Sequence, residues 1–179
     1  MSITPARILV AVEPTLAYLK IIGWANAAAS VHFKSILNHL KEKAVSTYVL
    51  DLTDCMMMDS TFLGILAGFS LRLSQTVPGA PSLRLMNPNS RIIDLLDNMG
   101  VSYLFQMVQG APPLAEYTAK ENQTPGMLQV AETSLEAHRT LMSLNPQNII
   151  KLKDVVAYLE EELKSAKDGN LPSDGSLKG

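Results

Sequence analysis

Residues 48–68 of this chain read YVLDLTDCMMMDSTFLGILAG. An apolar strand ends in the turn Asp59-Ser60-Thr61, and an apolar helix starts at once. Two hydroxyls therefore lie where a helix exposes unpaired backbone N–H groups and the positive end of its dipole. This position favours an anionic group, including a phosphate attached to the hydroxyl itself. A second interpretation stays open, because Asp, Ser and Thr are also the preferred N-cap residues of any helix.

The composition excludes several classes of function. A length of 179 residues suits one domain, or one domain with an appendage. The 15 basic and 17 acidic residues leave a net charge of −2, which argues against a nucleic-acid partner. No apolar run reaches the roughly 20 residues that a membrane span needs, and no signal-peptide core is recognisable. We therefore expect a cytoplasmic protein that neither binds nucleic acid nor enters a membrane.

The residues that usually carry chemistry are sparse and poorly spaced. Cys55 is the only cysteine, so an internal disulfide is impossible and we interpret it as a small apolar residue. His32 and His39 are seven residues apart on one predicted helix, which is too far for a shared metal ion. No phosphate-binding glycine loop, cysteine pair or HExxH motif occurs. The sequence thus predicts no catalytic residue, no metal site and no cofactor, and we expect a protein that is not an enzyme.

Apolar periodicity predicts alternating strands and helices in the first 109 residues. Strands are expected at residues 7–12, 16–22, 48–52, 83–86 and 103–108, and helices at 30–43, 62–73 and 89–98. Gly23 is expected to end the second strand, and Asn87 to cap the last of these helices with Pro88 at its first position. Such alternation indicates an α/β fold with helices packed on a sheet.

The C-terminal third has a different pattern. Residues 110–123 are predicted to be a linker, and residues 124–167 carry two apolar stripes at 3–4 spacing, with His138 in the first. Thr124-Pro125 and Asn145-Pro146 are the expected starts of the two helices. The short loop between the stripes predicts an antiparallel helical hairpin. Neither stripe is long enough for a stable free coiled coil, so the hairpin must pack on its own domain or on a second copy; we favour a homodimer. Residues 168–179 have the composition of a disordered tail.

Three motifs in the first 109 residues resemble the STAS domain of bacterial anti-sigma factor antagonists. The turn at 58–64 (MDSTFLG) resembles the family's strand, Asp-Ser-Ser/Thr-Gly-Leu-Gly, helix pattern. Residues 21–26 (IIGWAN) resemble the end of its second strand, and residues 85–96 (LMNPNSRIIDLL) its fourth strand and third helix. The resemblance covers about residues 5–109 and implies a STAS-like α/β domain at 1–109, a mixed sheet with helices packed on it.

The resemblance also implies a regulatory function. In this family a kinase phosphorylates a hydroxyl at this turn, a phosphatase removes the phosphate, and the unphosphorylated form binds the partner. By position the acceptor is Thr61, with Ser60 as the alternative. The implied partner is an anti-sigma factor or a serine/threonine kinase of histidine-kinase-like ATPase fold, which would place the protein in signal transduction and transcription regulation. The residues expected to contact it are Asp59, Met58, Phe62, Trp24 and Asn26.

The chain departs from the family pattern at three positions, and a second function also stays open. Phe62 replaces the usual glycine after the hydroxyl pair, Trp24 replaces a common arginine, and the second hydroxyl is Thr61 and not a serine. Some STAS proteins are constitutive accessory subunits of ABC-type transport ATPases, in which the same turn is an interface without phosphorylation. Met56, Met57 and Met58 lie just before the turn, and we expect them to divide between core and surface because a strand presents both faces.

Overall fold

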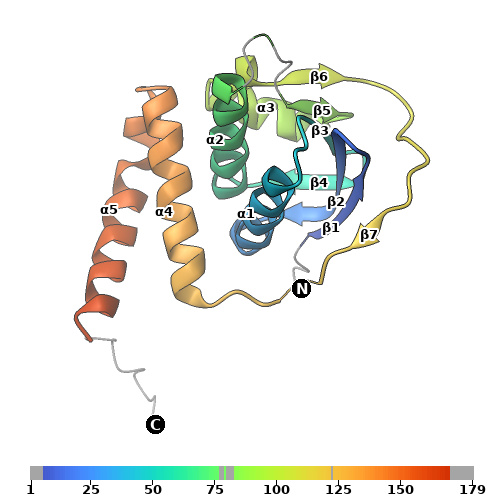
Figure 1. The fold of residues 1–179 in the computed structure, drawn as a ribbon. Helices are drawn as coiled ribbons and strands as arrows, with labels where there is room; N and C mark the ends of the chain where they lie inside the picture. The colour runs from blue at the N-terminus through green and yellow to red at the C-terminus, as the bar shows by residue number, and fades with distance from the viewer. Residues whose placement is uncertain (1–5, 77–78, 80–82, 122, 170–179) are drawn as a thin grey trace, which may run out of the picture.

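The computed structural model describes residues 6–76, 79, 83–121 and 123–169, which form an α/β part, a connector and a helical hairpin (Figure 1). The strands are β1 (Arg7–Val12), β2 (Leu16–Ala25), β3 (Thr47–Asp51), β4 (Cys55–Met58), β5 (Arg84–Met86), β6 (Gln106–Val108) and β7 (Thr118–Ala119). The helices are α1 (Ala27–Glu42), α2 (Ser60–Thr76), α3 (Ser90–Asn98), the short 3-10 helix η1 (Ser102–Leu104), α4 (Met127–Leu144) and α5 (Asn148–Lys167).

The strands form one mixed sheet. Its order is β6-β5-β3-β2-β1-β7, and β4 pairs with the second half of β2. Strand β1 runs antiparallel to β2 and to β7, whereas β2, β3, β5 and β6 run parallel to one another. Parallel neighbours need crossover connections, and α1, α2 and α3 supply them. The predicted mixed sheet with packed helices is therefore confirmed.

The helices lie in successive layers on one face of the sheet. Figure 1 shows α1 and α2 next to the sheet, then α4, and α5 outermost. Helix α4 packs against both α1 and α2, and α5 packs against α4. The hairpin predicted from the two apolar stripes is thus present, and it packs on the α/β part of its own chain.

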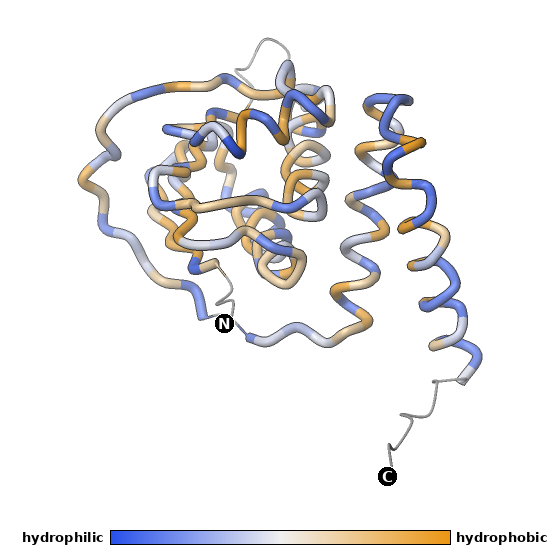
Figure 2. Tube along the Cα trace, turned by 180° about the vertical axis from the view of Figure 1, so that it is seen from behind, coloured by the Kyte–Doolittle hydropathy of each residue, from blue (hydrophilic) through white to orange (hydrophobic). Residues whose placement is uncertain are grey.

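The main core lies between the sheet and these helices. Figure 2 shows apolar segments concentrated there, while the outer side of α5 is largely hydrophilic. Tyr48, Phe33, Phe62 and Phe69 are the largest fully buried side chains of the core. Phe33 of α1 stacks on Phe62 of α2 at 4.5 Å between ring centroids, which fixes how the two helices sit together.

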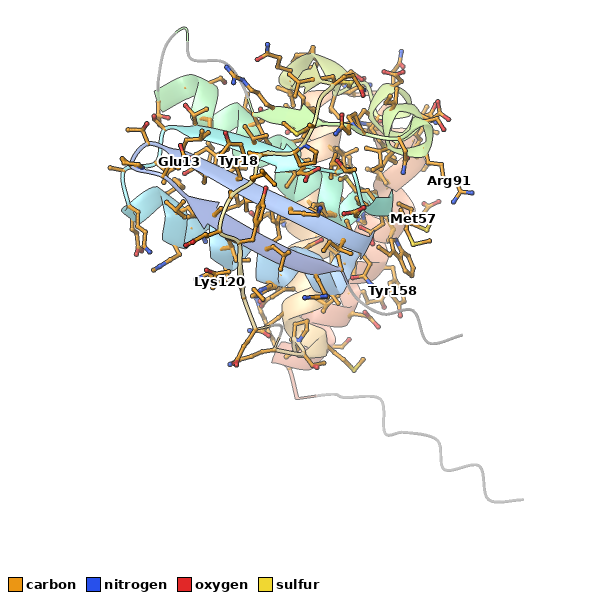
Figure 3. The ribbon with its side chains drawn as sticks, turned by 90° about the vertical axis from the view of Figure 1, so that its right-hand side faces the viewer. Glu13, Tyr18, Met57, Arg91, Lys120 and Tyr158 are labelled. Carbon is orange, nitrogen blue, oxygen red and sulfur yellow. The ribbon has the colours of Figure 1, made fainter. Side chains whose placement is uncertain are left out.

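The other face of the sheet is crossed by the connector. Figure 3 views this face, with Tyr18 on the sheet and Lys120 on the connector. The backbone of Lys120 donates to the carbonyl of Ile8, and β7 pairs with β1, so the predicted linker at 110–123 contains a short strand. On the same face Lys20 forms an ion pair with Asp54 at 2.7 Å, and the hydrogen bond to this carboxylate raises the pKa of Lys20.

Several predicted element boundaries are wrong, each for an identifiable reason. Gly23 does not end the second strand, because its φ of 95° accommodates a register shift where β2 leaves β3 and pairs with β4. Asn87 does not cap α3; it has a φ of 53° and donates its side-chain amide to Thr53 and to Gly110, while Asn89 accepts from the N–H of Ile92 as the cap. Residues 102–104 form a 3-10 turn, so the last predicted strand starts only at Gln106.

The boundaries of the hairpin also differ. Helix α4 begins at Met127 after Gly126, not at Thr124-Pro125, and α5 begins at Asn148, because Asn145 still accepts from the N–H of Gln147 in the turn. The predicted disordered tail lies outside the described residues from residue 170 onward. None of the helices in the described part of the chain is long and apolar enough to cross a membrane.

Candidate functional site

The site is built on the turn between β4 and α2. The N–H of Asp59 donates to the carbonyl of Ala25 at the end of β2, which holds the turn against the sheet. The carboxylate of Asp59 accepts a hydrogen bond of 2.9 Å from the N–H of Phe62. This is N-cap geometry, since the side chain satisfies one of the donors that the first turn of α2 leaves unpaired. The predicted capping by Asp59 is therefore confirmed.

Asp59 also sits where two helices begin. Burial raises its pKa above the ordinary value, while the backbone N–H groups of Phe62, Ala27 and Thr61 act in the opposite direction. Ala27 is the first residue of α1 and Thr61 belongs to the first turn of α2. One carboxylate thus fixes both helix starts relative to each other, and the turn is rigidly placed.

Thr61 and Ser60 both face α4. Thr61 is only 4% exposed, and its hydroxyl donates to the hydroxyl of Ser134 at 3.2 Å. The Ser60 hydroxyl lies 2.9 Å from Nε2 of His138. Both hydroxyls that the sequence singled out are therefore engaged by side chains of the C-terminal hairpin.

His138 is held neutral in this contact. Burial lowers its pKa, because the charged ring would lose its hydration. Its second nitrogen, Nδ1, is buried and finds no hydrogen-bond partner among the described residues. A buried polar atom without a partner is costly, so the contact between His138 and Ser60 is less favourable than its short distance suggests.

Below the hydroxyls the two helices touch backbone to backbone. A Cβ atom placed on Gly64 would lie 2.4 Å from the carbonyl oxygen of Ala137. One turn further on, a Cβ on Gly68 would lie 3.3 Å from the side-chain methyl of Thr140. Only a residue without a side chain fits at Gly64 while α4 stays in place.

The other predicted partner-binding residues are mostly structural in this conformation. Phe62 and Met58 are buried in the core. Asn26 caps α1 by accepting from the N–H of Ala29 at 2.9 Å. The indole nitrogen of the half-buried Trp24 has no hydrogen-bond partner within the described part of the chain. In this conformation these residues contribute to the shape of the turn and its surroundings, and Asp59 contributes as the cap of α2.

The methionines divide as expected. Met58 is buried, whereas Met56 is 67% and Met57 40% exposed at the end of the sheet, where Figure 3 labels Met57. Adaptable side chains of this kind suit a contact surface. Cys55 is buried next to them, and burial raises its pKa to about 11, so it is an unreactive thiol, in line with its interpretation as a small apolar residue.

Three residues of the site were not identified from the sequence: Gly64, Ser134 and His138. The available signal was that His138 stands in an otherwise apolar stripe of the hairpin. A polar side chain in such a stripe indicates a polar partner on the opposite surface, but the pattern does not say which. The described residues contain no cluster of His, Cys, Asp and Glu that could hold a metal ion.

Comparisons with known proteins give a structural likeness only. No protein-family model and no curated protein matches the sequence. The structure is similar to the anti-sigma factor antagonist SpoIIAA in its unphosphorylated form, with a TM-score of 0.50 and 20% identity over 59% of this chain and 88% of that one. Also similar are the protein TM1081 (TM-score 0.49, 18% identity, 56% and 78% covered) and the Bacillus cell fate determinant SpoIIAA in its phosphorylated form (0.47, 19%, 59% and 91%).

The extent of the likeness matches the division of the chain. The share covered by the SpoIIAA comparison is about the share that residues 6–109 occupy, and these residues hold the strand-turn-helix motif. The order of strands and helices predicted from apolar periodicity is found in residues 7–108, with one strand added: β4, which the sequence did not separate from the strand before it. The α/β part of this chain therefore has the fold of a STAS domain, the fold of the anti-sigma factor antagonist SpoIIAA.

Proposed function

We propose that this protein is a regulatory protein-interaction module, switched by phosphorylation of a hydroxyl at the Asp59-Ser60-Thr61 turn. The observation that carries the proposal is a pair of hydroxyls at the rigidly capped start of α2, in a chain with the fold of an anti-sigma factor antagonist. Thr61 is the favoured acceptor and Ser60 the alternative. The proposed partner is an anti-sigma factor or a serine/threonine kinase of histidine-kinase-like ATPase fold, with a phosphatase that resets the switch.

The physical basis of such a switch is local. A phosphate adds about −1.5 to −2 charges at neutral pH. Backbone N–H groups at the start of α2 tolerate that charge, so the α/β fold should survive. A partner surface pressed against the turn would meet a strongly hydrated group, and binding would be lost if that surface is apolar or acidic. The exposed Met56 and Met57 beside the turn would belong to the same contact surface.

The test is phosphosite mapping on the protein recovered from its own cells. We expect an intact mass raised by one phosphate and a phosphopeptide that contains Thr61. Thr61→Ala should abolish the modification and keep partner binding, whereas Ser60→Ala is the matched control that should leave the modification in place. A modification found only at Ser60 would transfer the role to that residue. No modification at either hydroxyl would overturn the switch.

A second function is favoured by one observation. Thr61 is buried, and its hydroxyl already has a structural use in the bond to Ser134. A constitutive accessory subunit of an ABC-type transport ATPase would use this turn as part of an interface and would carry no phosphate. Genes for an ABC-type ATPase and permease beside this one would support that alternative, and a histidine-kinase-like ATPase gene would support the switch.

Self-association through the hairpin stays a prediction. The hairpin packs on its own chain, yet Ile150, Val155 and Tyr158 of α5 remain exposed. Light scattering on the full chain would test it, and Tyr158→Glu is a suitable surface variant because this side chain packs into neither hydrophobic cluster. A monomeric mass for the unmodified chain would contradict the homodimer.

A further inference from the structure

The hairpin covers both hydroxyls of the proposed switch. Helix α4 places Ser134 on Thr61 and His138 on Ser60, and Thr61 is buried as a result. The active site of a kinase must surround the acceptor hydroxyl, and α4 occupies that space. A phosphate on Thr61 would also bring a hydrated charge into a buried seam, which is unfavourable without a cation to pair with it. Modification of Thr61 and the seated α4 therefore exclude each other.

The contact over the hydroxyls is largely polar. It includes the two hydroxyl contacts, the close approach of Ala137 to Gly64, and an ion pair between Lys34 and Glu136 whose side chains are both about 40% exposed. Exposed ion pairs add little stability, and the buried Nδ1 of His138 lacks a partner among the described residues. Among the described residues 127–138, Ala137 alone belongs to the main hydrophobic core, so this end of α4 places fewer apolar side chains in that core than the Leu141 end does.

The opposite end of the hairpin is anchored. Asn148 is fully buried, and its side-chain amide donates to the carbonyl of Met99 and to that of Leu141, both at 2.9 Å. Its Oδ1 is buried without a hydrogen-bond partner among the described residues, so an unpartnered polar atom is common to both ends and does not distinguish them. Leu141 and Leu152 belong to the main hydrophobic core of the α/β part. The turn between α4 and α5 is therefore fixed to the end of α3 by buried apolar and polar contacts together.

The hairpin also has a small core of its own. Leu135 of α4 packs with Val156, Leu159 and Leu163 of α5 in a cluster separate from the main core. These contacts hold the two helices to each other and not to the α/β part. The hairpin can therefore move as one body about its anchored turn, without losing the contacts that keep α4 and α5 together.

From these observations we propose that the hairpin α4–α5 is an autoinhibitory cover that pivots at the Asn145–Asn148 turn and must lift off Ser60 and Thr61 before either can be modified. This inference rests on the proposed function, since the turn it covers is the proposed switch. Linkage makes the effect reciprocal: whatever lifts the cover favours modification, and a phosphate on Thr61 holds the cover open.

The test uses the full chain and no kinase. Thr61→Cys in a Cys55→Ala background places a single thiol under α4, and the reaction of this introduced thiol with a small thiol reagent reports each opening. Native-state hydrogen exchange measures the opening of the core in the same protein. We expect the introduced thiol to react at least tenfold faster than core unfolding permits. A lifted hairpin has lost the packing that stabilises α4, so its helical hydrogen bonds open more readily, and the amides of 127–138 should exchange ahead of those in β2 and β3.

Gly64→Ala should act as a wedge. Alanine favours the helix itself, but its Cβ would collide with the backbone of Ala137. Overpacking of this kind should raise the reaction rate of the introduced thiol roughly ten- to a hundredfold. Gly68→Ala is the matched control, because its Cβ would meet the end of the Thr140 side chain, which can rotate away, and should change the rate less than about threefold.

A disulfide gives the opposite perturbation. The two hydroxyl oxygens of Thr61 and Ser134 lie 3.2 Å apart, so Thr61→Cys with Ser134→Cys should form a bond that locks the cover. The oxidised protein should lose the early exchange of 127–138, and the reduced form is its control. If the introduced thiol reacts only with global unfolding, or if Gly64→Ala opens core and cover equally, the cover is refuted. If phosphosite mapping finds no phosphate on Thr61 or Ser60, the proposed switch is refuted, but the thiol-reaction and amide-exchange rates that test the cover are not affected.

Discussion

The two ends of the contact between α4 and the α/β part differ in kind. At the Asn148 end, apolar side chains and a doubly bonded amide are buried together in the main core. At the Ser60 end, hydroxyls, a neutral imidazole and a glycine form the seam. Apolar burial stabilises by roughly 25 cal/mol per Å², while a net hydrogen bond contributes about 1 kcal/mol. One helix is thus firmly attached at one end and loosely at the other.

The largest effect should come from the anchored end. Leu141 is fully buried in the main core. Leu141→Ala should lower the free energy of unfolding by about 2–5 kcal/mol, because it removes apolar contacts and leaves a cavity. Denaturant unfolding followed by circular dichroism measures it. Leu128→Ala in the exposed first turn of the same helix is the control, and an equal loss in both variants would contradict the difference between the ends.

The cap of α2 should give an intermediate effect. Asp59→Ala should cost roughly 0.5–2 kcal/mol as a lost N-cap. Asn89→Ala is the comparison: Asn89 caps α3 with the same bond to the third N–H of its helix, at 3.1 Å, and its amide also donates to the carbonyls of Cys55 and Met56. We expect a loss on thermal melting at least as large for Asn89→Ala, but earlier hydrogen exchange in 127–138 only for the Asp59 variant. If residues 127–138 exchange at the same rate in both variants, the turn at Asp59 does not control how α4 packs on the α/β part.

The polar end should be sensitive to pH. The folded protein holds His138 neutral with a lowered pKa, whereas the unfolded chain takes up a proton near the ordinary value of 6.5. The stability that depends on neutral His138 is therefore fully present above pH 6.5 and is lost as the pH falls from there through the lowered pKa of the folded state. Unfolding curves between about pH 7.5 and 5.5 measure this loss, and His138→Gln should remove it.

His32 provides the necessary comparison for that titration. Burial lowers its pKa too, so it contributes a loss of the same sign, but it lies on α1 and not at the switch. We expect His32→Gln to reduce the pH dependence of global unfolding while leaving the exchange of 127–138 as pH-dependent as before. If only His32→Gln removes the pH dependence of both global unfolding and the exchange of 127–138, the His138 imidazole at Ser60 does not help to hold α4 in place.

The smallest effect should come from the ion pair at the polar end. Lys34 and Glu136 are both partly exposed, and exposed pairs contribute about 0–1 kcal/mol. Lys34→Met should therefore change the free energy of unfolding by less than about 1 kcal/mol, and added salt should not weaken the unmodified protein measurably. If Lys34→Met lowers the hydrogen-exchange protection of α4 by more than about 1 kcal/mol, charge and not packing holds the Ser60 end of α4 against the α/β part.

Local sequence signals predicted the α/β part well. The turn at Asp59-Ser60-Thr61, its cap and the division of the methionines between core and surface follow from residue types within a few positions of one another. Two of the misplaced boundaries share one cause. Gly23 and Asn87 adopt positive φ for contacts with strands and loops distant in the chain, and no local pattern encodes those contacts.

Tertiary structure decided whether the two hydroxyls of the proposed switch are covered. The sequence by itself determined a strand, a capped turn with two hydroxyls, and a hairpin with an apolar stripe, because periodicity and capping are local. It did not determine what the hairpin covers. Thr61 meets Ser134 across 73 residues, and that meeting depends on a glycine in α2 that lets α4 approach its backbone. An apolar stripe in the sequence shows that one face of a helix is buried. Which surface covers that face depends on tertiary packing.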